Sequence, residues 1–94
     1  MLTVNEYFNG KVKSIALEGK TLPATVGVMA AGEYAFGTDC KELMTVVSGE
    51  LSVQLPGEEQ WTTFVNGQSF EVESKSSFKV KALCDTAYFC EYWR

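Results

Sequence analysis

The sequence contains no histidine. Histidine is the side chain most often used as a metal ligand and as a general base near neutral pH. The chain therefore lacks both the commonest metal ligand and the commonest general base. We expect a protein that works without a metal ion and without any other cofactor.

Basic residues are few and scattered along the chain. There are 8 lysines and arginines against 12 aspartates and glutamates, which gives a net charge of −4. The basic residues form no stripe that could follow a phosphate backbone, so nucleic acid is not an expected partner.

Long apolar runs are also missing. The N-terminal residues MLTVNEYF contain no basic segment followed by a long apolar stretch, and no run is long enough to span a membrane. The three cysteines, Cys40, Cys84 and Cys90, are odd in number and form no CxxC motif, so free thiols are expected. These absences predict a cytoplasmic protein without membrane contact.

The length of 94 residues predicts one domain that spans residues 1–94. Apolar and polar residues alternate along it, and no window has a better helical period, which predicts an all-β chain. Turn signals separate the predicted strands: PGEE at 56–59 suits a type II turn, and Asn66-Gly67 predicts a hairpin. Many short strands with regular turns are typical of a sandwich or barrel. The nine predicted strands lie at about 11–17, 25–30, 33–38, 42–47, 51–55, 62–65, 69–72, 77–82 and 86–93.

Alternation also predicts which side chains face inward. In the strand at 77–82, Lys79 and Lys81 mark the solvent face, so Phe78 and Val80 should face the interior. The sets that share one face of a strand are Tyr34, Phe36 and Thr38; Phe78, Val80 and Ala82; and Tyr88, Cys90 and Tyr92.

The strand at 42–47 is apolar on both faces. Such a strand is usually covered on both sides, here by a second sheet or by a partner subunit. Together with the exposed edges of a small sheet, this pattern predicts a homodimer.

One segment has the spacing of a cupin metal-binding motif. Gly32 is followed after five residues by Thr38-Asp39-Cys40, and Glu42 is followed after six by Gly49. This frame resembles that of the cupins, in which a glycine precedes HxH and a glutamate. The resemblance implies a cupin-like β-barrel of jelly-roll type, in which only Glu42 of the usual metal ligands is present.

A closer resemblance covers almost the whole chain. NEYFNGKVKSI at 5–15, VGVMAAGEYAFGT at 26–38, LMTV at 43–46 followed by SG, and Leu55-Pro56 are similar to the small bacterial pyrimidine/purine nucleoside phosphorylases. The resemblance implies a pentosyltransferase that converts purine and pyrimidine nucleosides plus phosphate to free base and a (deoxy)ribose 1-phosphate. It also implies tolerance of many bases.

Such a reaction passes through a transition state with oxocarbenium character. The site must hold phosphate, enclose the base, stabilise positive charge on the sugar and help the base leave. Aromatic rings can hold any base through its π-face. The predicted substrate-binding residues are Tyr34, Phe36, Thr38, Met44, Phe78, Tyr88 and Tyr92, and each ring has an alternative role as barrel core.

Glu42 is the predicted catalytic residue. If it faces inward, as the corresponding cupin ligand does, burial would raise its pKa and it could bind ribose hydroxyls, stabilise the oxocarbenium or protonate the base. The alternative is an ordinary exposed glutamate, since Lys41 beside it is polar. Thr38 and Thr45 could add hydroxyl donors.

Phosphate ligands are harder to assign, because the chain has one arginine and no glycine-rich phosphate loop. Lys13, Lys41 and Arg94 are the predicted donors, with surface charge as the alternative role of each. Two other functions remain open. One is a non-catalytic, metal-free cupin that binds a small aromatic or sugar ligand, and the other is metal-dependent catalysis, which the missing imidazoles disfavour.

Overall fold

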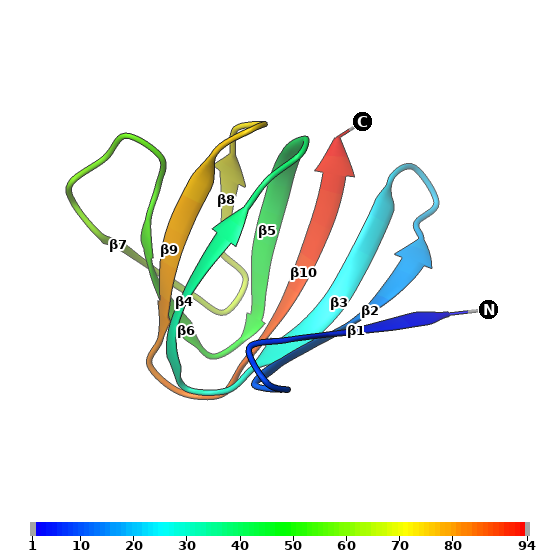
Figure 1. Cartoon of the computed structure of the whole chain (residues 1–94), viewed down its shortest axis with the longest axis horizontal. Coiled ribbons are helices and arrows are strands. Elements are labelled where there is room, and N and C mark those ends of the chain that lie inside the picture. Colours follow the sequence, from blue (N-terminus) through cyan, green and yellow to red (C-terminus); the bar gives the residue numbers. More distant parts are fainter. Residues whose placement is uncertain (1, 94) are drawn as a thin grey trace.

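The computed structural model describes residues 2–93, which form ten β-strands joined by turns (Figure 1). These residues contain no α-helix, which confirms the all-β prediction, and accordingly none that could cross a membrane. The strands are β1 (Thr3–Tyr7), β2 (Val12–Glu18), β3 (Pro23–Met29), β4 (Gly32–Gly37), β5 (Lys41–Ser48), β6 (Glu50–Gln54), β7 (Thr62–Val65), β8 (Ser69–Val72), β9 (Ser77–Ala82) and β10 (Thr86–Trp93).

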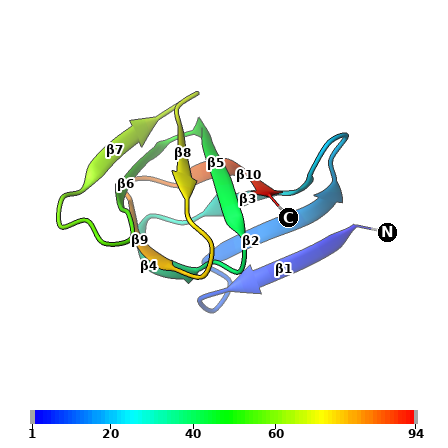
Figure 2. The ribbon, with the colours of Figure 1, turned by 90° about the horizontal axis from the view of Figure 1, so that it is seen from above.

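The strands form two antiparallel sheets that face each other. The larger has the order β1-β2-β3-β10-β5-β8, and the smaller has the order β4-β9-β6-β7. Seen from above, β1, β2 and β3 extend past the smaller sheet (Figure 2). Within residues 2–93 the two hydrogen-bonded ladders stay separate, so this jelly roll is an open sandwich.

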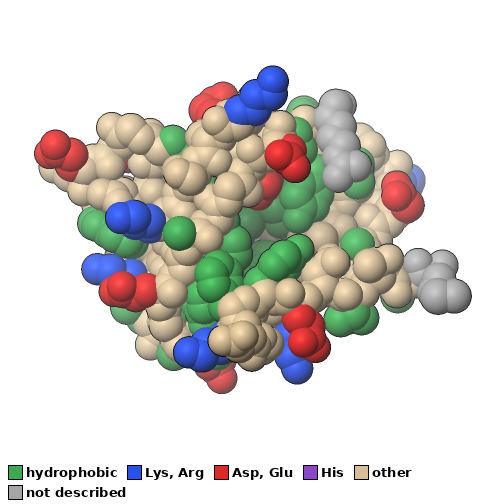
Figure 3. Space-filling model, viewed as in Figure 1, with side chains coloured by type: hydrophobic (Ala, Val, Ile, Leu, Met, Phe, Trp, Pro, Cys, Tyr) green, Lys and Arg blue, Asp and Glu red, His purple; other side chains and the backbone are tan. Residues whose placement is uncertain are grey.

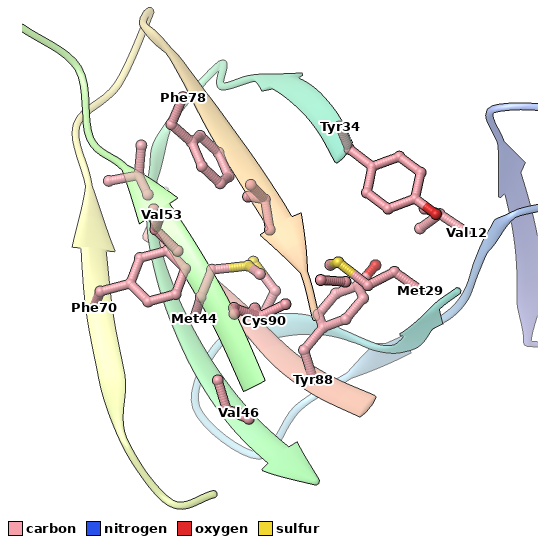
Figure 4. Close-up of a cluster of buried hydrophobic side chains, with 14 residues drawn as sticks. Val12, Met29, Tyr34, Met44, Val46, Val53, Phe70, Phe78, Tyr88 and Cys90 are labelled. Atoms are coloured by element: carbon pink, nitrogen blue, oxygen red, sulfur yellow. The ribbon is translucent and has the colours of Figure 1, made fainter. Parts of the chain in front are cut away.

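The core lies between the two sheets. Phe78 and Val80 are buried on the inner face of β9, as the alternation predicts, while Lys79 is exposed on the outer face. Side chains from the smaller sheet, such as Phe78, point toward Met44 and Tyr88 of the larger one (Figure 4). Among residues 2–93, no further layer covers the outer face of either sheet.

Strand β1 is missing from the sequence prediction. It pairs only with β2, at the edge of the larger sheet, and none of its residues is fully buried. A strand without a buried face has no alternation to recognise, which explains the omission. The other strands begin and end within two residues of the predicted limits.

Strand β5 is covered on one face only. Met44 and Val46 are buried against the smaller sheet, whereas Val47 on the opposite face is 54% exposed. The proposal that a second sheet covers the outer face is therefore wrong for the described part of the chain. A partner subunit at this face stays a prediction.

The Asn66-Gly67 turn is present, but the predicted hairpin is wrong. Strands β7 and β8, which flank it, belong to different sheets. The amide of Gln68 donates to the carbonyl of Val65, and of the two central residues only Gly67 has a positive φ. A two-residue hairpin of the type predicted needs positive φ at both, so this turn sends the chain across the sandwich instead.

Gly49 makes the sharpest connection in the fold. It is the single residue between β5 in one sheet and β6 in the other, and its φ is +125°. A Cβ at this position would lie 2.9 Å from the Cα of Thr86 and would also meet its hydroxyl. Thr86 is itself fully buried and its hydroxyl accepts from the amide of Glu50, so it has no room to move away.

Gly49→Ala should lower the free energy of unfolding by about 2–4 kcal/mol, because both the backbone strain and the clash with Thr86 must be accommodated. Gly57→Ala is the matched control, since Gly57 has a φ of +76° but no atom within 4 Å of a Cβ. It should cost only the left-handed strain, about 1–2 kcal/mol. Urea unfolding measures the free energy of unfolding of both variants. Equal losses of stability in the two would contradict the steric role assigned to Gly49.

Candidate active site

A cavity of about 410 Å³ opens between the two sheets. This volume lies within the range of small-molecule sites. Apolar side chains surround a hollow near the middle of the face shown in Figure 3. Its lining residues are Tyr7, Phe8, Ser14, Met29, Ala35, Phe36, Gly37, Glu42, Met44, Phe78, Tyr88, Cys90 and Tyr92.

The wall formed by the smaller sheet is aromatic. Phe36 on β4 and Phe78 on β9 are stacked with their centroids 5.6 Å apart and their planes 29° apart. Phe8, from the turn after β1, meets the edge of Phe36 at 5.5 Å. Rings in contact hold one another in place, so this wall is a fixed apolar surface for a flat ligand.

Phe8 has an unusual backbone conformation. Its φ is +54°, in the left-handed region that bulky residues rarely adopt, and the φ of Asn9 is +57°. The ring of Phe8 packs against Tyr34 at 5.0 Å as well as against Phe36. These contacts offset the strain and turn the ring toward the cavity.

The wall formed by the larger sheet is polar. It carries the carboxylate of Glu42 on β5 and the hydroxyl of Ser14 on β2. Three residues of β10 complete it: Tyr88, Cys90 and Tyr92. The thiol of Cys90 donates to Oε1 of Glu42 at 3.4 Å. The hydroxyl of Tyr88 forms a hydrogen bond with Ser14, so most polar groups on this wall already have a partner.

Glu42 is half-buried, and its surroundings disfavour its charge. Burial raises the pKa of its carboxyl above the ordinary value of 4.5, the hydrogen bond from Cys90 opposes that effect, and the negative charge of Asp39 adds to it. A carboxyl with a raised pKa can carry and donate a proton closer to neutral pH. This is the property that a general acid requires.

Tyr88 fits against the larger sheet because its partner across the ladder is Gly27 on β3. A Cβ at position 27 would lie 2.5 Å from Cζ of Tyr88, so the glycine leaves the space that the ring occupies. Burial raises the pKa of Tyr88 to about 12. Its hydroxyl consequently stays protonated at neutral pH.

The structure brings six of the predicted site residues together. They come from β4, β5, β9 and β10, and the inward position of Glu42 places it on the cavity wall and not at the surface. Their parts in binding or catalysis stay predictions. These six residues are Phe36, Glu42, Met44, Phe78, Tyr88 and Tyr92.

Two predicted substrate-binding residues lie outside the cavity lining. The hydroxyl of Tyr34 donates to the carbonyl of Ala30 at 2.6 Å. The hydroxyl of Thr38 donates to the carbonyl of Glu73 at 2.7 Å and accepts from the amide of Ser76 at 3.1 Å. Both hydroxyls therefore hold loops in place and are already engaged.

Two of the three predicted phosphate ligands, Lys13 and Lys41, lie in the described part of the chain, and neither lines the cavity. Lys13 forms an ion pair with Glu6 at 3.8 Å, and Lys41 forms one with Glu71 at 3.3 Å, both on the outer face of the larger sheet. Arg94 lies outside the described residues.

Five polar or bulky residues line the cavity but were not predicted from the sequence to contact a ligand. Three of them come from the β1–β2 hairpin, whose first strand was not predicted. Of this hairpin only β2 alternates between buried and exposed residues, so the pattern Val12-Lys13-Ser14-Ile15 could have indicated that Ser14 faces inward. The residues are Tyr7, Phe8, Ser14, Met29 and Cys90.

A second recess, of about 490 Å³, adjoins the cavity at Glu42 and is also lined by Asp39 and Cys40. Across residues 2–93, no three His, Cys, Asp or Glu side chains are placed to hold one metal ion. All three cysteines are free.

The comparisons with known proteins agree on one family. A family model described as pyrimidine/purine nucleoside phosphorylase matches residues 2–92. A protein of that name from Saccharophagus degradans is 67% identical over 94 residues and covers 100% of both chains. Another of that name, from Teredinibacter turnerae, is 63% identical over 94 residues with the same coverage.

Solved structures agree on the fold. A protein of unknown function from Vibrio parahaemolyticus is 47% identical, with a TM-score of 0.95 over 99% of each chain. An RmlC-like cupin from Shewanella frigidimarina is 19% identical, with a TM-score of 0.76 over 97% of this chain and 82% of that one. The cupin-like fold predicted from the sequence is confirmed.

The raised pKa of Glu42 has a consequence for stability. Folded protein keeps the Glu42 proton at pH values where the unfolded chain has released it, so wild-type stability falls as pH rises from the ordinary value of 4.5 through the raised pKa. Glu42→Gln does not ionise. We expect the variant to match wild type near about pH 4 and to be more stable than wild type near about pH 8.

Urea unfolding at the two pH values measures the difference. Glu59→Gln, which removes one negative charge from an exposed turn, corrects for the change in net charge. A Glu42→Gln protein that is less stable than wild type at the higher pH would contradict the buried, destabilised carboxylate.

Proposed function

This chain belongs to the pyrimidine/purine nucleoside phosphorylase family, and on that premise we propose that it is an enzyme that transfers a pentosyl group from a purine or pyrimidine base to phosphate. The observation that supports this most is the arrangement of the cavity. An aromatic wall faces a polar wall that carries one carboxylate with a raised pKa.

The aromatic wall is the proposed base site. Phe36 and Phe78 present stacked rings, and stacking contributes about 1–3 kcal/mol per base whatever the base is. This contact does not depend on the hydrogen-bonding groups at the edge of the base. The proposed enzyme therefore accepts both purines and pyrimidines.

Glu42 is the proposed general acid. In the proposed reaction the bond from C1′ to the base nitrogen breaks, and a phosphate oxygen forms the new bond to C1′. Protonated Glu42 gives its proton to the leaving base, and the proton of hydrogen phosphate returns to Glu42. The raised pKa of Glu42 supports this role, because a larger share of the carboxyl is protonated near neutral pH.

Phosphate is proposed to bind at the polar wall, where the Ser14 hydroxyl can accept from Tyr88 and donate its own proton to a phosphate oxygen. Of the three predicted cations, Arg94 remains the proposed ligand within the same chain. Lys13 and Lys41 point to the outer face, away from the cavity, so neither is proposed as a phosphate ligand.

A homodimer is proposed through the outer face of the larger sheet. Apolar side chains, three of them exposed and one half-buried, form a row across four paired strands, and ion pairs flank it, so the same surface can face its own copy across a two-fold axis. We propose the cytoplasm as its compartment, where free cysteines are stable. The row is Val4, Ile15, Val26 and Phe89, each paired with the next.

Inosine and uridine should each release free base in the presence of phosphate and not in its absence. Glu42→Gln should lower kcat by about 10²-fold or more, because the amide cannot donate the proton as an acid. Chromatographic detection of free base and pentose 1-phosphate measures the reaction. Glu59→Gln should keep full activity.

Two results would contradict the proposed function. Base release at the same rate in phosphate-free buffer would indicate hydrolysis. Binding of nucleosides that raises the melting temperature without their consumption would favour a non-catalytic binding protein.

Val26→Glu should shift the protein from dimer to monomer, because a charge at the centre of the apolar row would be buried without a partner. Val65→Glu is the control, since Val65 on β7 is 42% exposed, close to the 46% of Val26, but lies in the other sheet. Sedimentation velocity at micromolar protein measures the change. A wild-type monomer, or a Val26→Glu dimer, would contradict this interface.

A further inference from the structure

Cys90 lies at the centre of the polar wall. It is 1% exposed, in the middle of β10, and its Sγ is 3.4 Å from Oε1 of Glu42. A thiol beside a carboxylate donates its proton to a hydrogen bond with the oxygen. Burial raises the pKa of the Cys90 thiol well above its ordinary value, and the Glu42 charge adds to this, so the donor keeps its proton across the working pH range.

The hydroxyls of Tyr92 and Thr25 hold the Cys90 thiol in place. The hydroxyls of Tyr92 and Thr25 are 3.0 Å apart, and the Tyr92 hydroxyl forms a hydrogen bond with the Cys90 thiol. Thr25 lies on β3 directly opposite Cys90, and Glu42 lies on β5 directly opposite Tyr92. The four side chains thus form a chain of hydrogen bonds whose spacing is set by backbone pairing across three strands.

The strength of the donor matters to the proposed acid. A hydroxyl at the same place would form a stronger hydrogen bond to the ionised carboxylate and would favour the charged form. A thiol is a weak donor, so it can orient Glu42 without cancelling the effect of burial. An apolar residue would leave the inward carboxylate without this contact.

We propose that Cys90 is a positioning residue for Glu42, whose thiol, held by Tyr92 and Thr25, fixes the carboxyl against the polar wall of the cavity. The catalytic consequence rests on the proposed phosphorolysis. The contact itself does not depend on it.

Other titratable groups lie near Glu42 and also affect the pH at which its carboxyl ionises. Asp39, next to the start of β5, is the nearby charge and raises the Glu42 pKa. The hydroxyls of Tyr88 and Tyr92 face it from β10, and Tyr7 faces it from the β1–β2 hairpin. Cys40 shares the adjoining recess. None of these groups changes in the Cys90 variants whose Glu42 carboxyl is titrated, so the titration isolates the effect of the thiol.

The test compares Cys90→Ala and Cys90→Ser with wild type, and Cys84→Ala serves as control because Cys84 is an exposed thiol. The Glu42 carboxyl is titrated by ¹³C NMR, with the resonance assigned by its absence in Glu42→Gln. Loss of the donor should raise the Glu42 pKa by about half a unit to one unit in Cys90→Ala, and the serine hydroxyl should lower it below the wild-type value.

Kinetics provide the second measurement. The pH profile of kcat/KM should move in the same direction as the NMR titration in each variant. Cys90→Ala should lower kcat about tenfold with the nucleoside KM changed by less than about twofold, and Cys90→Ser should recover most of kcat at a shifted optimum. A Glu42 titration that is the same in wild type and Cys90→Ala would overturn the proposal.

A third measurement leaves Cys90 unchanged, in case its variants do not fold. In a Cys40→Ser, Cys84→Ser background Cys90 is the only thiol, so its S–H stretching band can be observed directly. Adding Glu42→Gln should raise the S–H frequency, since an amide oxygen is a weaker acceptor than a carboxylate. An unchanged band would overturn the contact. If the titration and infrared shifts are as expected but the wild-type protein catalyses no phosphorolysis, the proposed function is overturned. The contact between Cys90 and Glu42 would then still stand.

Discussion

The position of β10 between β3 and β5 is the constraint on which the cavity depends. Side chains alternate along a strand, so a slip of one residue would turn Tyr88, Cys90 and Tyr92 outward and bring Phe89 and Glu91 inside. A bulge between Ala87 and Tyr88 fixes the pairing with β5. Beyond this bulge Glu42 lies opposite Tyr92, with Cys90 in reach of its carboxyl.

The two walls of the cavity differ in chemistry because they belong to different sheets. Phe36 and Phe78 on the smaller sheet keep water away from one side, and this strengthens electrostatic effects on the other. Burial is the largest cause of the raised pKa of Glu42. The same rings that are proposed to hold the base thus help to keep a proton on the group that is proposed to release it.

Much of this arrangement could be predicted from the sequence, because alternation reports which face of a strand is buried. It placed Phe78 and Val80 inside and grouped Tyr88 with Tyr92, and the motif frame drew attention to Glu42. It failed where no buried face exists, as in the edge strand β1, and with it the hairpin that supplies Phe8 was missed. Thr38 shows a further limit, since sequence cannot reveal that its hydroxyl is engaged by Glu73 and Ser76.

The direct test of the central claim is whether a nucleoside occupies the cavity between the sheets. Met29 and Met44 both line it, so protein labelled with ¹³C-methyl methionine carries two probes inside the proposed site. Addition of a nucleoside should shift both methyl resonances with saturation, because the base brings a ring current close to them. Unmoved Met29 and Met44 signals at a nucleoside concentration that supports turnover would place the reaction elsewhere on the molecule.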